Sequence, residues 1–209
     1  MSLSLNEAES LAKTAARGAG LSWGMAEEAA KATRWLAVRG VDACDPLVAL
    51  LFRHDEEGHA QTGPQALGPD WQGAEGWLCP VACGAVLSDL GDEVQFPLTL
   101  RRVALPVFLL PFAAQLAKDL GRPLVLSWDG GDALTDGNAF TLHVPPPMSD
   151  VTLRLGDPAQ APAACPHHTR TDTDQMILVS LGIYAARTRA PATDQSRLAG
   201  AGAGLTDND

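Results

Sequence analysis

The chain has 209 residues, of which 46% are apolar and 19% charged, a balance typical of a globular domain and unlike that of a disordered chain. Lys and Arg total 15 against 25 Asp and Glu, which gives a formal net charge of −10. A surface this negative repels phosphate backbones and anionic membranes, so we expect neither nucleic acid nor a membrane as a partner.

The first third of the chain is predicted to be helical. Residues 4–18 begin with Ser and carry Glu three positions later, which is the spacing of a capping box. A second helix is expected over residues 22–40, where a basic last turn precedes a glycine stop. Asp45-Pro46 then predicts a cap and a first-turn proline for a short third helix, residues 47 to about 54.

The rest of the chain alternates between turns, strands and three further helices. Residues 55–75 are rich in Gly, Gln, Pro and acidic side chains, so we expect a surface loop there. Helices are predicted over residues 79–90, 111–120 and 172–187. Strands are predicted over residues 93–100, 123–128, 140–144 and 151–155, with Pro97 favouring an edge position or a bulge in the first of them.

Helices first, and then strands with a few helices among them, are typical of an α+β fold. We expect an N-terminal helical segment followed by a mixed or antiparallel sheet with packed helices. Residues 1–190 are predicted to form a single α+β domain, with its helical part at residues 1–60 and its sheet-containing part at residues 76–190. A Gly/Ala-rich C-terminal segment follows at residues 191–209.

Several features together resemble one bacterial family over the whole chain. They are the N-terminal helical pair, Cys79-Pro80 with Gly84-Ala85 and Asp89 nearby, and the ending at residues 187–209 with its AlaProAlaThr, GlyAlaGlyAlaGly and AspAsnAsp strings. The family is the domain-of-unknown-function family DUF3726. The resemblance names a family and implies no chemistry.

The first forty-odd residues are also similar to the N-terminus of the malate/L-lactate dehydrogenases that lie outside the Rossmann group. The similarity is carried by the two helices that close on Leu36-Ala-Val-Arg-Gly-Val-Asp42. In that family the next residues are Ser-His-Gly, with a catalytic histidine, whereas this chain has Ala43-Cys44-Asp45. The resemblance therefore implies a degenerate relative without dehydrogenase activity at that position, because the imidazole is absent.

Cys79 is the candidate catalytic residue. Pro80 occupies the position of a first-turn proline, which places Cys79 beside a helix N-terminus, where free N–H groups and the helix dipole stabilise a thiolate. Cys83 follows one turn later and is a candidate resolving thiol. The alternative is that both are small core residues, since free cysteine is commonly buried.

A metal site is a second possibility, although the spacing is no zinc signature. Cys79 and Cys83 have a permissible ligand spacing, and Cys165 and His167 offer a second group far along the chain. A strong zinc motif would have two close pairs, and this sequence has one. The alternative for the Cys165–His168 region is a solvated loop.

The C-terminal segment is the candidate ligand-binding site. Alternating glycines let the backbone approach a ligand closely or form an anion-binding nest, and a preceding Ser-Arg pair can hold a carboxylate or a phosphate. The alternative is a flexible tail or a segment that packs on another surface. The candidate ligand-binding residues are Ser196, Arg197, Gly200, Gly202 and Gly204.

Three functional hypotheses follow, and the sequence leaves all of them open. The first is a cytoplasmic enzyme or binding protein for a small anionic metabolite that uses the C-terminal segment. The second is a non-catalytic structural or interaction protein whose tail docks on another subunit, with a homo-oligomer as one form of it. The third is the degenerate dehydrogenase relative. No motif predicts a cofactor, and the lack of a secretion signal and of a disulfide framework favours a cytoplasmic location with reduced thiols.

Overall fold

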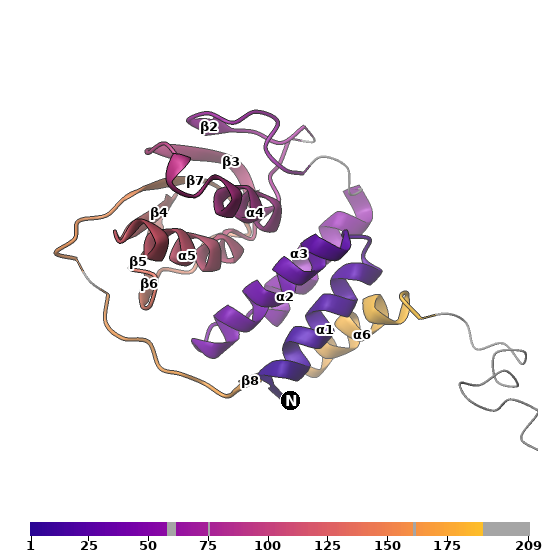
Figure 1. Cartoon of the computed structure of the whole chain (residues 1–209). Helices are drawn as coiled ribbons and strands as arrows, with labels where there is room; N and C mark the ends of the chain where they lie inside the picture. Colours follow the sequence, from indigo (N-terminus) through magenta and orange to yellow (C-terminus); the bar gives the residue numbers. More distant parts are fainter. Residues whose placement is uncertain (58–61, 75, 161, 190–209) are drawn as a thin grey trace, which may run out of the picture.

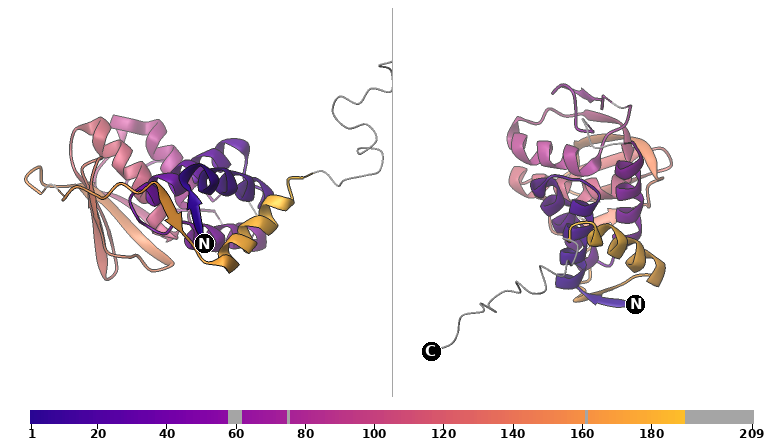
Figure 2. Two further views of the ribbon diagram at one scale, coloured as in Figure 1. Left: turned by 90° about the horizontal axis from the view of Figure 1, so that it is seen from below. Right: turned by 90° about the vertical axis from the view of Figure 1, so that its right-hand side faces the viewer.

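The helices and the strands separate into two parts of the molecule, as the α+β prediction required (Figure 1). The computed structural model describes residues 1–57, 62–74, 76–160 and 162–189. Seen from below, the sheet lies at one end and a bundle of helices at the other (Figure 2). Two helices, α4 (Pro80–Leu90) and α5 (Leu110–Leu120), lie between the sheet and the bundle (Figure 1). Helix α5 contacts β4 and β5 of the sheet, and both helices contact α2 of the bundle.

The N-terminal helices begin where their caps predict. The capping box of α1 (Leu5–Gly18) is confirmed, because Ser4 N–H donates to Glu7 Oε2 at 2.7 Å and Glu7 N–H donates to Ser4 Oγ at 3.2 Å. Helix α2 (Trp23–Val38) follows and packs along α1. The α1 face that meets the bundle is built largely of alanine, which lets the helices approach closely. The buried alanines of α1 are Ala8, Ala12, Ala15 and Ala16.

The third helix starts earlier and ends later than predicted. Helix α3 spans Cys44–Glu57, so Asp45 and Pro46 lie inside its first turn. The capping carboxylate is that of Asp42, whose Oδ1 accepts the Cys44 N–H at 3.1 Å. At the other end an Arg53–Glu57 ion pair of 2.7 Å spans the last turn. The helix therefore extends into the segment predicted to be a loop.

The main sheet has six strands in the order β2-β3-β7-β4-β5-β6. The β2–β3 pair is parallel and all other neighbours are antiparallel, so the sheet is mixed. Buried leucines and valines of the central strands face α5 and form the core with it. The strands are β2 (Asp70–Trp71), β3 (Leu98–Ala104), β4 (Leu124–Trp128), β5 (Gly131–Thr135), β6 (Phe140–Leu142) and β7 (Met148–Leu155).

One strand prediction began at the wrong residue, and two strands of the main sheet were missed. The strand predicted at residues 93–100 begins only at Leu98, because a 3₁₀ turn, η1 (Gly91–Glu93), and Pro97 precede it. Strand β5 was missed because its residues follow the tight turn after Trp128 and were attributed to that turn. Strand β2 was missed within the predicted loop because it has only two residues, too few for an alternating pattern.

The end of the described chain returns to its beginning. A two-stranded sheet pairs β1 (Ser2–Ser4) with β8 (Arg170–Asp172), and helix α6 (Gln175–Ala186) then packs on α1. The contact is close, because a Cβ placed on Gly18 would lie 1.7 Å from the carbonyl oxygen of Tyr184. The N-cap of α6 is Asp174, so the helix starts three residues later than predicted. No helix in the described ranges is long and apolar enough to span a membrane.

Candidate functional site

Cys79 lies at the N-terminus of α4, as the cysteine–proline pair predicted. It is the N-cap residue and Pro80 follows at the first helical position. Its own N–H donates to the carbonyl of Thr62 at 2.8 Å, and its side chain makes no capping bond to the helix. The residue is buried, with 3% of its surface exposed.

The structure places a histidine next to this thiol. Nε2 of His54 lies 3.3 Å from Sγ of Cys79, although the two residues are 25 positions apart. His54 comes from the last turn of α3, which ends beside the start of α4. The edge of its ring meets Trp77, with 5.2 Å between the ring centroids and an interplanar angle of 64°. Trp77 therefore fixes the orientation in which the imidazole faces the sulfur.

The Cys79–His54 pair lies in a small cavity where three helices meet. The cavity has a volume of about 170 Å³. Its outer wall is the turn between α1 and α2, where Gly20 and Ser22 are exposed. The inner wall is apolar except for the pair itself and two hydroxyl groups. The lining residues are Gly20, Leu21, Ser22, Met25, His54, Thr62, Cys79 and Ala82.

Burial and local dipoles act on the Cys79 thiol in opposite directions. Burial raises its pKa to about 11, while the first-turn N–H groups of Ala82 and Val81 and the Thr62 hydroxyl favour the thiolate and act to lower the pKa. These donors belong to the first turn of α4 and to the cavity wall, so they point to where charge would develop on sulfur. At neutral pH the resting group is a thiol with a base beside it.

The other cysteines lack such surroundings. Cys83, the predicted resolving thiol, is fully buried, and burial raises its pKa well above the ordinary value, with the neighbouring Cys79 acting in the same direction. Burial also raises the pKa of Cys44, with the charge of Asp42 as the next cause. Cys165 is half-buried and contacts the backbone of Phe140.

The weak metal candidates do not come together. In the described part of the chain no three His, Cys, Asp or Glu side chains form a group that could hold a metal ion. Cys79 and Cys83 lie at the start of α4, whereas Cys165 contacts β6 and His167 is exposed in the segment that leads to β8. The structure therefore does not bring these four candidates together.

The predicted ligand-binding residues cannot be compared with the structure. Ser196, Arg197, Gly200, Gly202 and Gly204 all lie outside the described residues. Their role in binding an anion stays a prediction.

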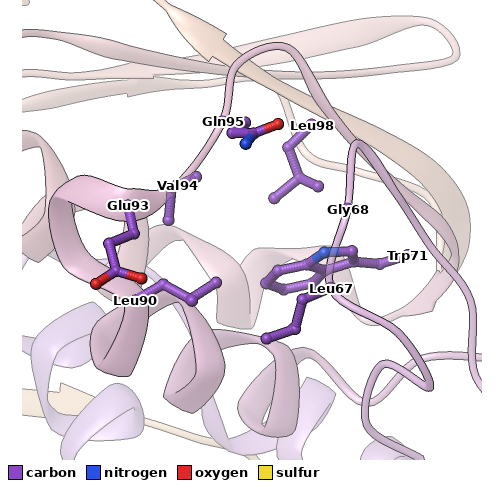
Figure 3. Close-up of a pocket in the computed structure, with 8 residues that line it drawn as sticks. All are labelled: Leu67, Gly68, Trp71, Leu90, Glu93, Val94, Gln95 and Leu98. Carbon is purple, nitrogen blue, oxygen red and sulfur yellow. The ribbon is translucent and has the colours of Figure 1, made fainter.

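A second cavity, of about 290 Å³, lies at the far side of α4, beside β2 and η1 (Figure 3). The indole ring of Trp71 lies on the same side as Leu67 and Gly68, and Leu90 and Glu93 lie across the cavity from it. The Nε1–H of Trp71 is buried and has no hydrogen-bond partner among the described residues. Neither a cysteine nor a histidine lines this cavity, so it lacks the nucleophile and base that the Cys79 cavity contains.

Sequence reasoning missed His54, and one signal pointed to it. On α3 the residues Leu47, Leu50, Leu51 and His54 follow helical spacing, and all four are buried. A histidine at the end of an apolar stripe is a buried polar group that needs a partner. The spacing shows that the imidazole faces inward, but only the packing of α3 against the start of α4 shows that the partner is Cys79.

Comparison with known proteins gives one match. Residues 3–67 match the model of a family described as "Protein of unknown function (DUF3726)". This range contains α1, α2 and α3, so it includes His54 and ends before Cys79. No curated protein and no solved structure matches the chain. The predicted DUF3726 resemblance is thus supported over these residues but not over the whole chain, and the dehydrogenase similarity stays a prediction.

Proposed function

We propose that the chain is a thiol-dependent enzyme in which Cys79 attacks the carbonyl carbon of a small acyl compound and His54 moves the protons. The observation that carries this proposal is the 3.3 Å contact between Sγ of Cys79 and Nε2 of His54 inside a cavity. A thiol becomes a strong nucleophile when an adjacent base accepts its proton. The pair supplies both parts of that reaction.

The first step forms a thioester. As Sγ bonds to the carbonyl carbon, Nε2 of His54 takes the thiol proton and the carbonyl π electrons move onto oxygen. The tetrahedral intermediate then collapses, its bond to the leaving group breaks, and the imidazolium returns the proton to that group. Water next attacks the thioester, with His54 again as the base, and the acid product and the free thiol are released.

The start of α4 favours negative charge in this step. The N–H groups of Val81 and Ala82 lie in the first turn of the helix and stabilise charge on the sulfur, as does the Thr62 hydroxyl. A high resting pKa is compatible with this chemistry, because the imidazole removes the proton during the attack and not before it.

The size of the cavity limits the substrate. A volume of about 170 Å³ corresponds to roughly five or six water molecules at about 30 Å³ each. An acyl group of a few carbon atoms fits this space, and its apolar part would contact Leu21 and Met25. A larger leaving group would have to lie outside, beyond Gly20 and Ser22.

The experiment is alkylation of the native protein with iodoacetamide at pH 8, followed over time by peptide mass spectrometry. We expect Cys79 to be modified faster than Cys83 and Cys44, because it alone of the three lies beside His54 in a cavity. In His54→Gln the rate at Cys79 should fall by roughly 100-fold, the range of a lost general base. Cys165 is the internal control, since it is distant from His54 in the fold and its rate should not change.

A clear result against the proposal would be a Cys79 that stays unmodified in native protein while Cys165 reacts. Equal rates at Cys79 in wild type and His54→Gln would also contradict it. Either result would favour the non-catalytic alternative, in which Cys79 and His54 are a buried packing pair. The predicted anion-binding role of Ser196 and Arg197 is independent of this test, because the proposal uses only Cys79 and His54.

A further inference from the structure

Helix α6 has the composition of a buried helix. Its twelve residues, Gln175–Ala186, include no charged side chain, and apolar residues occur on every side of it. A surface helix of a globular protein normally has one apolar and one polar face, and a helix that is apolar all round is normally covered. Its sequence therefore predicts contacts on both faces.

The structure covers only one of these faces. Leu181, Tyr184 and Ala185 are buried against the bundle. On the opposite side Met176 is 68% exposed, Val179 48% and Ile183 58%. With Gly182 and Ala186 these residues form a continuous stripe, which we call the outer face of α6, and no described residue covers it.

We propose that the outer face of α6 packs antiparallel against the same face of a second copy of the chain, about a two-fold axis near residue 181. In that arrangement Val179 lies opposite Ile183 of the other copy, and Met176 lies opposite Ala186. A large side chain thus meets a small one at the ends of the contact. Gly182, near the axis, has no heavy atom within 4 Å of its Cβ position and lets the two helices approach closely.

Charge complementarity selects a second copy in this orientation. Asp172 and Arg189 lie at the N-terminal and C-terminal ends of α6, and both are exposed. Arg187 is instead held by Asp55 of the same copy at 2.7 Å, and Asp174 caps its own helix. The midpoint of Asp172 and Arg189 falls next to the proposed axis, so Asp172 of each copy meets Arg189 of the other. The antiparallel helix dipoles favour the same orientation. A parallel pair would instead bring like charges together.

The experiment is sedimentation velocity on the full chain at about 100 μM, a concentration suited to the weak association expected of a small interface. We expect a dimer, with twice the monomer mass of 21.9 kDa. The double variant Val179→Glu/Ile183→Glu places charges in the apolar contact and should raise the dissociation constant by roughly 100-fold. Val144→Glu is the matched control, because Val144 is 87% exposed outside α6 and its substitution should leave the dimer unchanged.

A charge-swap series tests the orientation without changing the apolar face. Asp172→Arg alone and Arg189→Glu alone should each weaken the dimer by about 3- to 10-fold. The combined variant should restore it, because each new Arg then faces a new Glu across the axis. Circular dichroism of every variant confirms that the monomer is folded.

Three outcomes would overturn the proposal. One is a wild-type chain that is monomeric up to about 200 μM, well above the range expected for such an interface. Another is a dimer that persists in Val179→Glu/Ile183→Glu, which would place the interface elsewhere. The third is a wild-type monomer that dimerises only after residues 190–209 are deleted, which would mean that this segment occupies the outer face itself.

Discussion

The Cys79 cavity and the Trp71 cavity differ in their lining residues, and their volumes do not reflect this difference. The Trp71 cavity is the larger of the two, about 290 Å³ against about 170 Å³, but its lining contains neither a cysteine nor a histidine. The smaller cavity brings a thiol and an imidazole within 3.3 Å. The comparison teaches that a thiol and an imidazole meet where helix α3 ends beside the start of α4, in the smaller of these two cavities.

The two cavities also differ in whether a buried polar group has polar neighbours. In the Trp71 cavity an indole N–H stays without a partner among the described residues. In the Cys79 cavity the sulfur lies 3.3 Å from an imidazole nitrogen, and the Thr62 hydroxyl and the first-turn N–H groups of α4 act to lower its pKa. Several polar groups directed at one atom are the mark of an organised site. The predictions below test whether the two cavities are independent.

The largest expected effect is on the pH dependence of stability. Burial raises the pKa of Cys79 to about 11, above the ordinary value of 9.0. The folded protein therefore keeps the thiol protonated where the unfolded chain ionises it, so stability is complete below pH 9 and is lost as the pH rises towards 11. The loss by pH 11 should be about 2 kcal/mol, from about 1.4 kcal/mol per pKa unit.

Urea unfolding at pH 8 and at pH 11, for wild type and Cys79→Ser, measures this effect. The serine hydroxyl does not titrate in this range, so the variant should lose about 2 kcal/mol less than wild type over the interval. Cys83 contributes a loss in the same direction in both proteins, and most of it cancels in the comparison, because burial and not Cys79 is the main cause of its raised pKa. Equal losses would mean that Cys79 is not shielded from water as the structure indicates.

An effect of similar size on stability is expected from a substitution that displaces α4. Gly84 lies against the Phe112 ring of α5, and a Cβ there would be 2.1 Å from that ring. Gly84→Ala should therefore destabilise the protein by about 2 kcal/mol and slow the alkylation of Cys79, because α4 carries the thiol. Gly24→Ala is the matched control, since Gly24 is also helical, has nothing within 4 Å, and should gain up to about 1 kcal/mol. Similar effects of the two substitutions in urea unfolding would contradict this account.

The elements that could be predicted from sequence are those with strong local signals. The capping box at Ser4 and Glu7 and the cysteine–proline start of α4 are each defined within a few residues, and both were correct. The short strands β2 and β8 were missed because their pairing partners are distant in sequence and contribute nothing to a local pattern. Propensity alone does not identify strands that tertiary contacts create.

The same distinction between local signals and long-range contacts applies to the residues of the candidate site. Cys79 was identified because its helix position is a local property of the sequence. Its partner His54 was not, because the contact depends on how the end of α3 packs beside the start of α4. Helical spacing placed His54 among the buried leucines of α3, but no rule of spacing names a partner 25 residues away.

The smallest expected effects come from substituting Trp71 and Trp77. Comparing the two substitutions tests most directly whether the two cavities are independent. Trp71 and Trp77 are both fully buried, and the Nε1–H of each lacks a partner in the described part of the chain. Trp71→Phe and Trp77→Phe should therefore cost a similar and modest amount of stability, about 1 kcal/mol each, because neither loses a hydrogen bond. The two substitutions should differ in their effect on the rate at which iodoacetamide modifies Cys79.

Only Trp77 contacts His54. Trp77→Phe should thus change the iodoacetamide rate at Cys79 by about 3- to 10-fold, the scale of a ring contact of about 1 kcal/mol, whereas Trp71→Phe should leave that rate unchanged. If Trp71→Phe slowed Cys79 as much as Trp77→Phe, the two cavities would be coupled through α4, whose last turn lines one cavity and whose first turn lines the other. A difference confined to Trp77 would instead show that the orientation of one imidazole sets the reactivity of the thiol.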